Sequence, residues 1–212
     1  MTIIDLSHTL EPGMPVLASN ENPAIERIAG IGADGYRETR LSICSHNGTH
    51  VDAPAHLLDE GLFLEQLPLD RFFGPALLLD VSDHRQPLIT PDRLQPHEAA
   101  IHRAEFVIFR TGWSRVWGQE KYYQNFPVLT QPAAQWLLGF NLKGLGIDAF
   151  SFDPYDAAPY PVHRLLLGGG LILVENLNNL ESIPTSRFQF SCLPLPYGQA
   201  DGSPVRAVAL VE

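Results

Sequence analysis

The chain has 212 residues, of which 45% are hydrophobic and 18% are charged, a composition typical of one globular domain with a sizeable core. Its formal net charge of -10, with no run of lysine or arginine to offset it, argues against a nucleic acid or an anionic membrane as a partner. No stretch approaches the roughly 20 apolar residues of a membrane span, and the first residues lack the pattern of a signal peptide, so we expect a cytoplasmic protein whose residues 1–212 form a single domain.

Short apolar runs recur along the chain and predict seven strands. In chain order these are 36–44, 76–81, 106–109, 144–148, 171–174, 187–193 and 205–211. Helices are predicted after Thr90-Pro91 and after Thr130-Gln131-Pro132, where a threonine N-cap precedes an early proline, and another is predicted from Gly112. Several strands are apolar on both faces, but too few helices separate them for a purely parallel sheet. We therefore expect an α/β fold with a mixed central sheet.

Segment 153–170 contains three prolines and three consecutive glycines. These residues interrupt regular structure, so we predict a long irregular loop of the kind that often carries function. Tyr155 and Tyr160 in this segment, and Trp113 elsewhere, offer aromatic rings either for a flat substrate or for packing a loop onto the core.

The densest chemical feature lies between residues 45 and 56, which read Ser-His-Asn-Gly-Thr-His-Val-Asp-Ala-Pro-Ala-His. This segment holds three of the eight histidines of the chain, together with an aspartate. Imidazole nitrogens and carboxylate oxygens are ligands that Zn²⁺ and Mn²⁺ prefer. The pattern therefore predicts a metal site, against the alternative of solvated loop histidines beside a turn aspartate.

Backbone geometry limits how these residues can share an ion. A straight strand would separate the Cα atoms of His46 and His50 by about 13 Å, at about 3.3 Å per residue. Asn47-Gly48 is a strong turn signal, so we expect the chain to fold back there. Beyond the turn, His50 and Asp52 project to the same side of an extended segment. One metal can then bind His46, His50 and Asp52, which leaves His56 unligated as an acid/base group.

Two residues further along the chain, His163 and Glu175, have more than one interpretation. Glu175 ends the apolar run 171–174, which reads as a buried strand. A carboxylate in that place needs a partner, and either a metal or an arginine would serve. His163 could cap the short segment 165–167 as well as bind a metal.

The pattern His-x-Gly-Thr-His-x-Asp-x-Pro-x-His resembles the signature of the cyclase family of metal-dependent hydrolases, which includes bacterial kynurenine formamidases. The resemblance spans most of the chain, because it continues in Asp5-Leu6-Ser7-His8, Arg110-Thr111-Gly112-Trp113, Gly146-Ile147-Asp148 with Ser151 and Asp153, and Glu175-Asn176-Leu177. It implies a swivelling β/β/α fold, a small-molecule substrate and a homodimer or larger assembly. The implied reaction is hydrolysis of the C–N bond of a small amide, an aryl formamide or a lactam.

The resemblance also implies roles for individual residues. A first ion would be held by His46, His50 and Asp52, and Asp52 would bridge to a second ion held by His163 and Glu175. His56 would be the proton shuttle. The cofactor would be two divalent ions per chain, Zn²⁺ or Mn²⁺.

Two departures bear on the substrate and on the metal count. Kynurenine formamidases carry a tryptophan soon after the opening Asp-Leu/Ile-Ser segment, whereas no tryptophan precedes Trp113 here, which weakens a formylkynurenine assignment. Family members with one manganese replace the second-site glutamate by a neutral residue, so the presence of Glu175 favours two metals.

Three alternatives stay open at this point. The first is a mononuclear manganese lactam hydrolase of the isatin type, and the second is a non-catalytic metal-binding protein in which His56 is also a ligand. The third is a thiol hydrolase that uses Cys44 or Cys192 with a histidine, although neither cysteine lies in a nucleophile motif and we expect both to be reduced core thiols.

Overall fold

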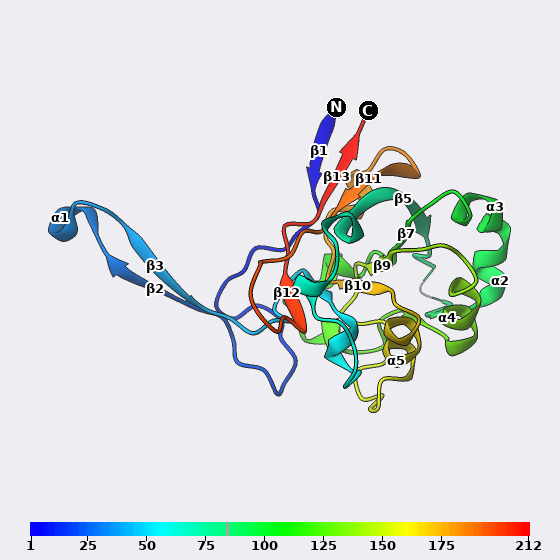
Figure 1. The fold of residues 1–212 in the computed structure, drawn as a ribbon, viewed down its shortest axis with the longest axis horizontal. Coiled ribbons are helices and arrows are strands. Elements are labelled where there is room, and N and C mark those ends of the chain that lie inside the picture. Colours follow the sequence, from blue (N-terminus) through cyan, green and yellow to red (C-terminus); the bar gives the residue numbers. More distant parts are fainter. Residues whose placement is uncertain (84) are drawn as a thin grey trace.

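The computed structural model describes residues 1–83 and 85–212, and its centre is a mixed β-sheet (Figure 1). Nine of the described strands form this sheet. From one edge to the other they are β1 (Thr2–Asp5), β13 (Val208–Val211), β11 (Arg187–Ser191), β5 (Phe73–Asp80), β7 (Phe106–Arg110), β9 (Gly144–Ile147), β10 (Ile172–Glu175), β4 (His50–Asp52) and β12 (Gly202–Pro204). The pairs β5–β7, β7–β9 and β9–β10 are parallel, and the remaining pairs are antiparallel. The predicted α/β fold with a mixed sheet is therefore confirmed.

The parallel centre of the sheet is apolar on both faces, as its sequence predicts. In β7, Val107 and Phe109 belong to one hydrophobic cluster, whereas Phe106 and Ile108 belong to a second cluster on the opposite face. All four side chains are fully buried. Alternation of side chains along a strand explains why both faces must be covered.

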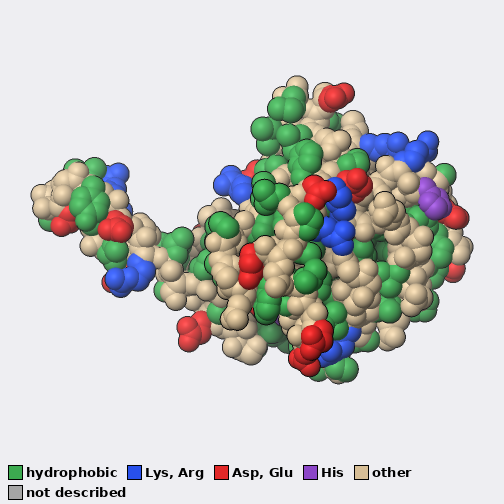
Figure 2. Space-filling model, in the orientation of Figure 1, with side chains coloured by type: hydrophobic (Ala, Val, Ile, Leu, Met, Phe, Trp, Pro, Cys, Tyr) green, Lys and Arg blue, Asp and Glu red, His purple; other side chains and the backbone are tan. Residues whose placement is uncertain are grey.

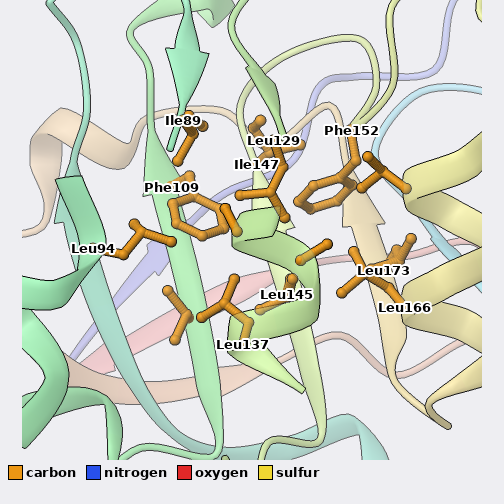
Figure 3. Packing of buried hydrophobic residues seen from close by; sticks show 14 of the residues in the cluster. Ile89, Leu94, Phe109, Leu129, Leu137, Leu145, Ile147, Phe152, Leu166 and Leu173 are labelled. Carbon is orange, nitrogen blue, oxygen red and sulfur yellow. The ribbon is translucent and has the colours of Figure 1, made fainter. Parts of the chain in front are cut away.

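Helices and loops cover the first of these faces. The helices on this side are α2 (Pro91–Leu94), α3 (Glu98–Ile101), α4 (Gln131–Leu137) and α5 (Pro161–Gly168). Figure 3 shows Leu94, Leu137 and Leu166 from three of them packed with strand residues such as Phe109 and Leu145. A two-stranded parallel ribbon of β6 (Leu88–Ile89) and β8 (Val128–Leu129) contributes to the same cluster. Within the described ranges, no helix is both long and apolar enough to cross a membrane.

A hairpin projects from the body as an arm, composed of β2 (Ala24–Ala29), β3 (Glu38–Ser42) and the short helix α1 (Ile31–Asp34) at its tip (Figure 1). Figure 2 shows hydrophobic side chains on this arm among charged ones. Ile31, Tyr36 and Leu41 are each more than half exposed. The arm therefore has no core of its own within the described chain.

Four predictions about elements need correction. The strand at 36–44 forms, as β3, but it lies in the arm and not in the central sheet. The strand predicted at 205–211 begins only at Val208. The irregular loop predicted at 153–170 contains helix α5, because Pro161 occupies the first helical turn and the glycines follow the helix instead of interrupting it. The predicted helix at Gly112 is a short 3₁₀ turn, Trp113–Val116.

Candidate metal centre

The register of the sheet places two of the candidate ligands face to face. Strand β4 pairs antiparallel with β10, with His50 opposite Glu175 and Asp52 opposite Leu173. His50 Nε2 lies 3.6 Å from Glu175 Oε2 and 3.3 Å from Asp52 Oδ1. All three side chains are buried. The end of β10 and the whole of β4 therefore form the floor of the site.

The predicted reversal at Asn47-Gly48 is present and returns His46 to the same place. Asn47 Oδ1 accepts a hydrogen bond from the Cys44 amide at 2.7 Å, and Gly48 has a φ of 67°, which favours glycine. His46 Nδ1 consequently lies 2.7 Å from Asp52 Oδ1. The ring of His46 rests on Gly202 of β12, where a Cβ would lie 2.4 Å from its Cε1. His46 can therefore occupy this position only because residue 202 is a glycine.

His163 approaches from helix α5 on the other side of Asp52. Its Nε2 lies 2.9 Å from Glu175 Oε1 and 3.7 Å from Asp52 Oδ2. Asp153 accepts hydrogen bonds from the amides of Val162 and His163, which caps the start of α5, and its Oδ2 also lies 2.8 Å from His163 Nδ1. Asp153 therefore fixes both the helix and the orientation of the imidazole ring.

All six predicted residues line one cavity of about 180 Å³. The carboxylate of Asp52 lies between the His46 side and the His163 side of this cavity. Two groupings bring donor atoms within 4.8 Å of one another, namely His46, Asp52 and His56, and His50, Asp52 and Glu175. These groupings differ from the predicted ligand sets in two respects. His56 is a member of the first grouping, and His50 is grouped with Glu175. The assignment of individual residues to two ions stays a prediction.

The donors present fit a divalent cation. Asp52 Oδ2 is buried and has no hydrogen-bond partner among the described residues, although an unpaired buried carboxylate oxygen is costly. His50 Nδ1 is held by the carbonyl of Gly48 at 2.8 Å and His163 Nδ1 by Asp153. This leaves the Nε2 atoms facing the carboxylates, which is the arrangement that metal-binding histidines show. Nitrogen and carboxylate donors without thiolate suit Zn²⁺ or Mn²⁺.

The electrostatic field of the site favours positive charge. Burial by itself lowers the pKa of His46, but the carboxylates of Asp201 and Asp52 outweigh it and raise that pKa to about 10. Burial likewise lowers the pKa of His163, and Glu175 and Asp153 outweigh it, which raises that pKa to about 10. In protein without metal, His46 and His163 therefore tend to carry protons, and these positive charges occupy the place that the carboxylates offer to a metal cation.

His56 lies at the more exposed side of the cavity, in the short turn Pro54–His56, with 29% of its side chain exposed. Its ring centroid is 4.0 Å from that of His46, and its Nδ1 is 3.7 Å from Asp201 Oδ2. The same Asp201 oxygen lies 3.0 Å from His46 Nε2. His46 and His56 together hold the pKa of Asp201 below its ordinary value.

Asp201 and Asn176 take part in the site although the sequence interpretation gave neither a role. Asp201 precedes Gly202, and an Asp-Gly pair reads as an ordinary turn. Asn176 has a φ of 55° and donates from Nδ2 to the carbonyl of Gly48 at 3.1 Å, while its Oδ1 accepts a hydrogen bond from the buried Tyr122 hydroxyl at 2.7 Å. For Asn176, the sequence did offer a signal, because this residue belongs to the Glu175-Asn176-Leu177 segment of the family resemblance.

Other candidates from the sequence have structural roles. Asp148, which belongs to the family resemblance, accepts hydrogen bonds from the Thr111 and Gly112 amides, so it anchors a turn. Trp113 packs against the core. Cys192 is fully buried, and burial raises the pKa of its thiol well above the ordinary value, which argues against a thiolate nucleophile. Cys44 is only half-buried, so the prediction of a core thiol is confirmed for Cys192 alone.

Comparison with known proteins agrees with this geometry. The family model "Putative cyclase" matches residues 4–154. A kynurenine formamidase from Salinibacter ruber is 31% identical, with 98% of this chain and 97% of that protein covered. An isatin hydrolase from Roseibium aggregatum is 28% identical over 99% of this chain and 91% of that protein. The structure of isatin hydrolase A from Ralstonia solanacearum superposes with a TM-score of 0.88 at 31% identity, covering 100% of this chain and 92% of that chain.

The fold, the ligand cluster and these relatives together define the class of the protein, which is a metal-dependent hydrolase. More particularly, the chain belongs to the cyclase family.

Proposed function

We propose that the protein hydrolyses the C–N bond of a small non-peptide amide, either an aryl formamide or a lactam. The observation that carries this proposal is the buried Oδ2 of Asp52, which accepts no hydrogen bond from the described residues although it lies among three histidines and Glu175 in the cavity. The cavity is smaller than the 300–1,000 Å³ of drug-sized ligand pockets, which favours a compact substrate. We assign the reaction to one hydrolase domain that spans residues 1–212.

We assign His46, His50, Asp52, His163 and Glu175 to two divalent ions, Zn²⁺ or Mn²⁺. When bound there, such ions would lower the pKa of water from 15.7 to about 7 and would polarise the substrate carbonyl. Asp153 and the carbonyl of Gly48 hold His163 and His50 in the orientation that binding requires. Retention of Glu175 supports two ions over one.

His56 is assigned to proton transfer. As water attacks the carbonyl carbon, His56 takes the proton that water releases, and it returns this proton to the amide nitrogen when the C–N bond breaks. The carboxylate of Asp201 faces His56 Nδ1, which leaves Nε2 for the reacting groups. Water thereby adds across the bond to give a carboxylic acid and an amine.

The test is hydrolysis of formanilide and of isatin by protein stripped with a chelator and then reloaded with zinc or with manganese. Activity should be absent in stripped protein and should return with one of the ions. If neither ion restores hydrolysis of either substrate, the proposed function is wrong.

A lactam hydrolase that uses one manganese ion is the second candidate. Its lactam substrate, but not its metal count, is favoured by the similarity to a structure of an isatin hydrolase, with a TM-score of 0.90 at 26% identity. A non-catalytic metal protein is less favoured, because the cavity opens beside the histidines instead of being closed by a fourth ligand.

We also propose that the protein assembles as a homodimer or a larger oligomer. The arm supports this, because an isolated two-stranded hairpin is marginally stable in water and this one exposes Ile31, Tyr36 and Leu41. A second copy of the chain is the partner we assign to it, and light scattering of the native chain and of an Ile31→Asp, Leu41→Asp variant tests the assignment. Absence of nucleic-acid partners and cytoplasmic location stay predictions from the sequence.

A further inference from the structure

The segment of residues 15–20, which we call the strap, has no helix or strand and lines the cavity with four of its residues. Two tyrosine hydroxyls hold it in place. The hydroxyl of Tyr123 accepts a hydrogen bond from the Val16 amide at 3.1 Å, and that of Tyr155 accepts one from the Ala18 amide at 3.3 Å. The strap is thus fixed to residues more than 100 positions away in the sequence.

The two tyrosines belong to a rigid aromatic platform. The rings of Tyr123, Phe150 and Tyr155 contact one another pairwise, with centroid distances of 5.3, 5.6 and 5.5 Å. Rings at these distances and inclinations attract one another beyond the area they bury. Because each ring touches the other two, the platform resists displacement, and its two hydroxyls fix the position of the strap.

The strap and the platform give the cavity two chemically distinct halves. The titratable residues of the lining are the metal-ligand set and, at the more exposed side, His56, whereas the strap contributes Pro15, Val16 and Leu17 and the platform contributes Phe150 and Tyr155. Asn20 and Ser151 add neutral polar groups. Within the described part of the chain, no lysine or arginine lines the cavity. An anionic group carried away from the reacting bond would therefore lose water without gaining a cationic lysine or arginine partner.

We propose that the strap makes the site selective for uncharged aromatic amides, and that it rejects substrates with a charged group on the far side of the ring. This inference rests on the proposed function, because it concerns the half of the substrate that the metal ligands do not touch. It distinguishes formanilides and lactams without charge from amides that carry an amino-acid group.

The experiment compares two formanilides that differ in charge but not in shape, 4-formamidobenzenesulfonate and its uncharged methyl sulfone analogue. Sulfonate is a weak metal ligand, so a difference between the two compounds reports on the strap and the platform and not on the ions. Both kcat/KM and Kd are measured, the latter by calorimetry. We expect the methyl sulfone to be favoured by at least about tenfold in both quantities, which is the effect of a modest desolvation penalty.

Variants at Leu17 assign the selectivity to the strap. Leu17→Arg supplies a cation there and should reduce the preference by about tenfold or more, whereas Leu17→Gln, which is polar but uncharged, should not. The electronic difference between the two compounds is the same for each variant, so it cancels in this comparison. A native protein without preference, or equal ratios in the two variants, would overturn the inference. If neither compound is hydrolysed with either ion, the proposed function fails, and the ratio of Kd values still decides the role of the strap.

Discussion

Replacement of Gly202 by alanine tests whether the ring of His46 must lie where the structure places it. A Cβ at residue 202 would be 2.4 Å from His46 Cε1 and 2.9 Å from each ring nitrogen, whereas ordinary contacts begin at 3.4 Å. The ring must therefore move by the difference of about 1 Å, while metal–ligand distances tolerate about 0.2 Å. A misplacement of about 1 Å at a reacting centre lowers the rate by about 100-fold, and we expect a loss of that size in kcat/KM.

The fold should survive this substitution, because Gly202 does not have a positive φ and the imidazole can swing away. The assay is formanilide hydrolysis with zinc, together with the zinc content and the Tm of each variant. Gly198→Ala is the matched control, since a Cβ there meets nothing within 4 Å. Full activity in Gly202→Ala would refute the placement of His46, and an equal loss in Gly198→Ala would show that the effect is not local.

Three further predictions concern proton transfer, packing and pH. His56→Ala should keep its metal but lose about 100-fold or more in kcat, and an unchanged kcat would contradict the assignment. Tyr122→Phe leaves Asn176 Oδ1 without its buried donor, so urea unfolding should show a loss of about 1–3 kcal/mol; an unchanged free energy would argue against that bond. In metal-free protein, the raised pKa values of His46 and His163 stabilise the fold fully below about pH 6.5, and this contribution is lost as the pH rises towards 10. The Tm of stripped protein should fall over that range, and a rising Tm would contradict the sign.

The strands at the centre of the fold were predictable because buried strands consist almost entirely of apolar residues. Segments 106–109 and 171–174 are apolar on both faces, and both are central strands. Strand β4 was predicted only as an extended segment, because a three-residue strand of His, Val and Asp carries no periodicity that would place it in a sheet. Helix α5 was missed because its cap is Asp153, eight residues before the helix and outside any local capping pattern.

The site was predictable to the extent that its ligands are adjacent in sequence. His46, His50, Asp52 and His56 lie within eleven consecutive residues that form a turn, a short strand and a second turn, so their spacing already indicates a common centre. Their meeting with His163 and Glu175 depends on the pairing of β4 with β10 and on the position of α5, which only the family resemblance suggested. Asp201 and the strap come from distant segments whose residues look like ordinary turns, so nothing local indicated them.

The central claim is that Asp52 and the five residues around it form a hydrolytic centre with two ions. It is tested most directly by elemental analysis of the native protein and of Glu175→Gln, each purified without chelators and reloaded separately with zinc and with manganese. We predict two ions per chain in the native protein and one in the variant. One ion per chain in both would contradict the binuclear assignment and would remove His163 and Glu175 from the metal site.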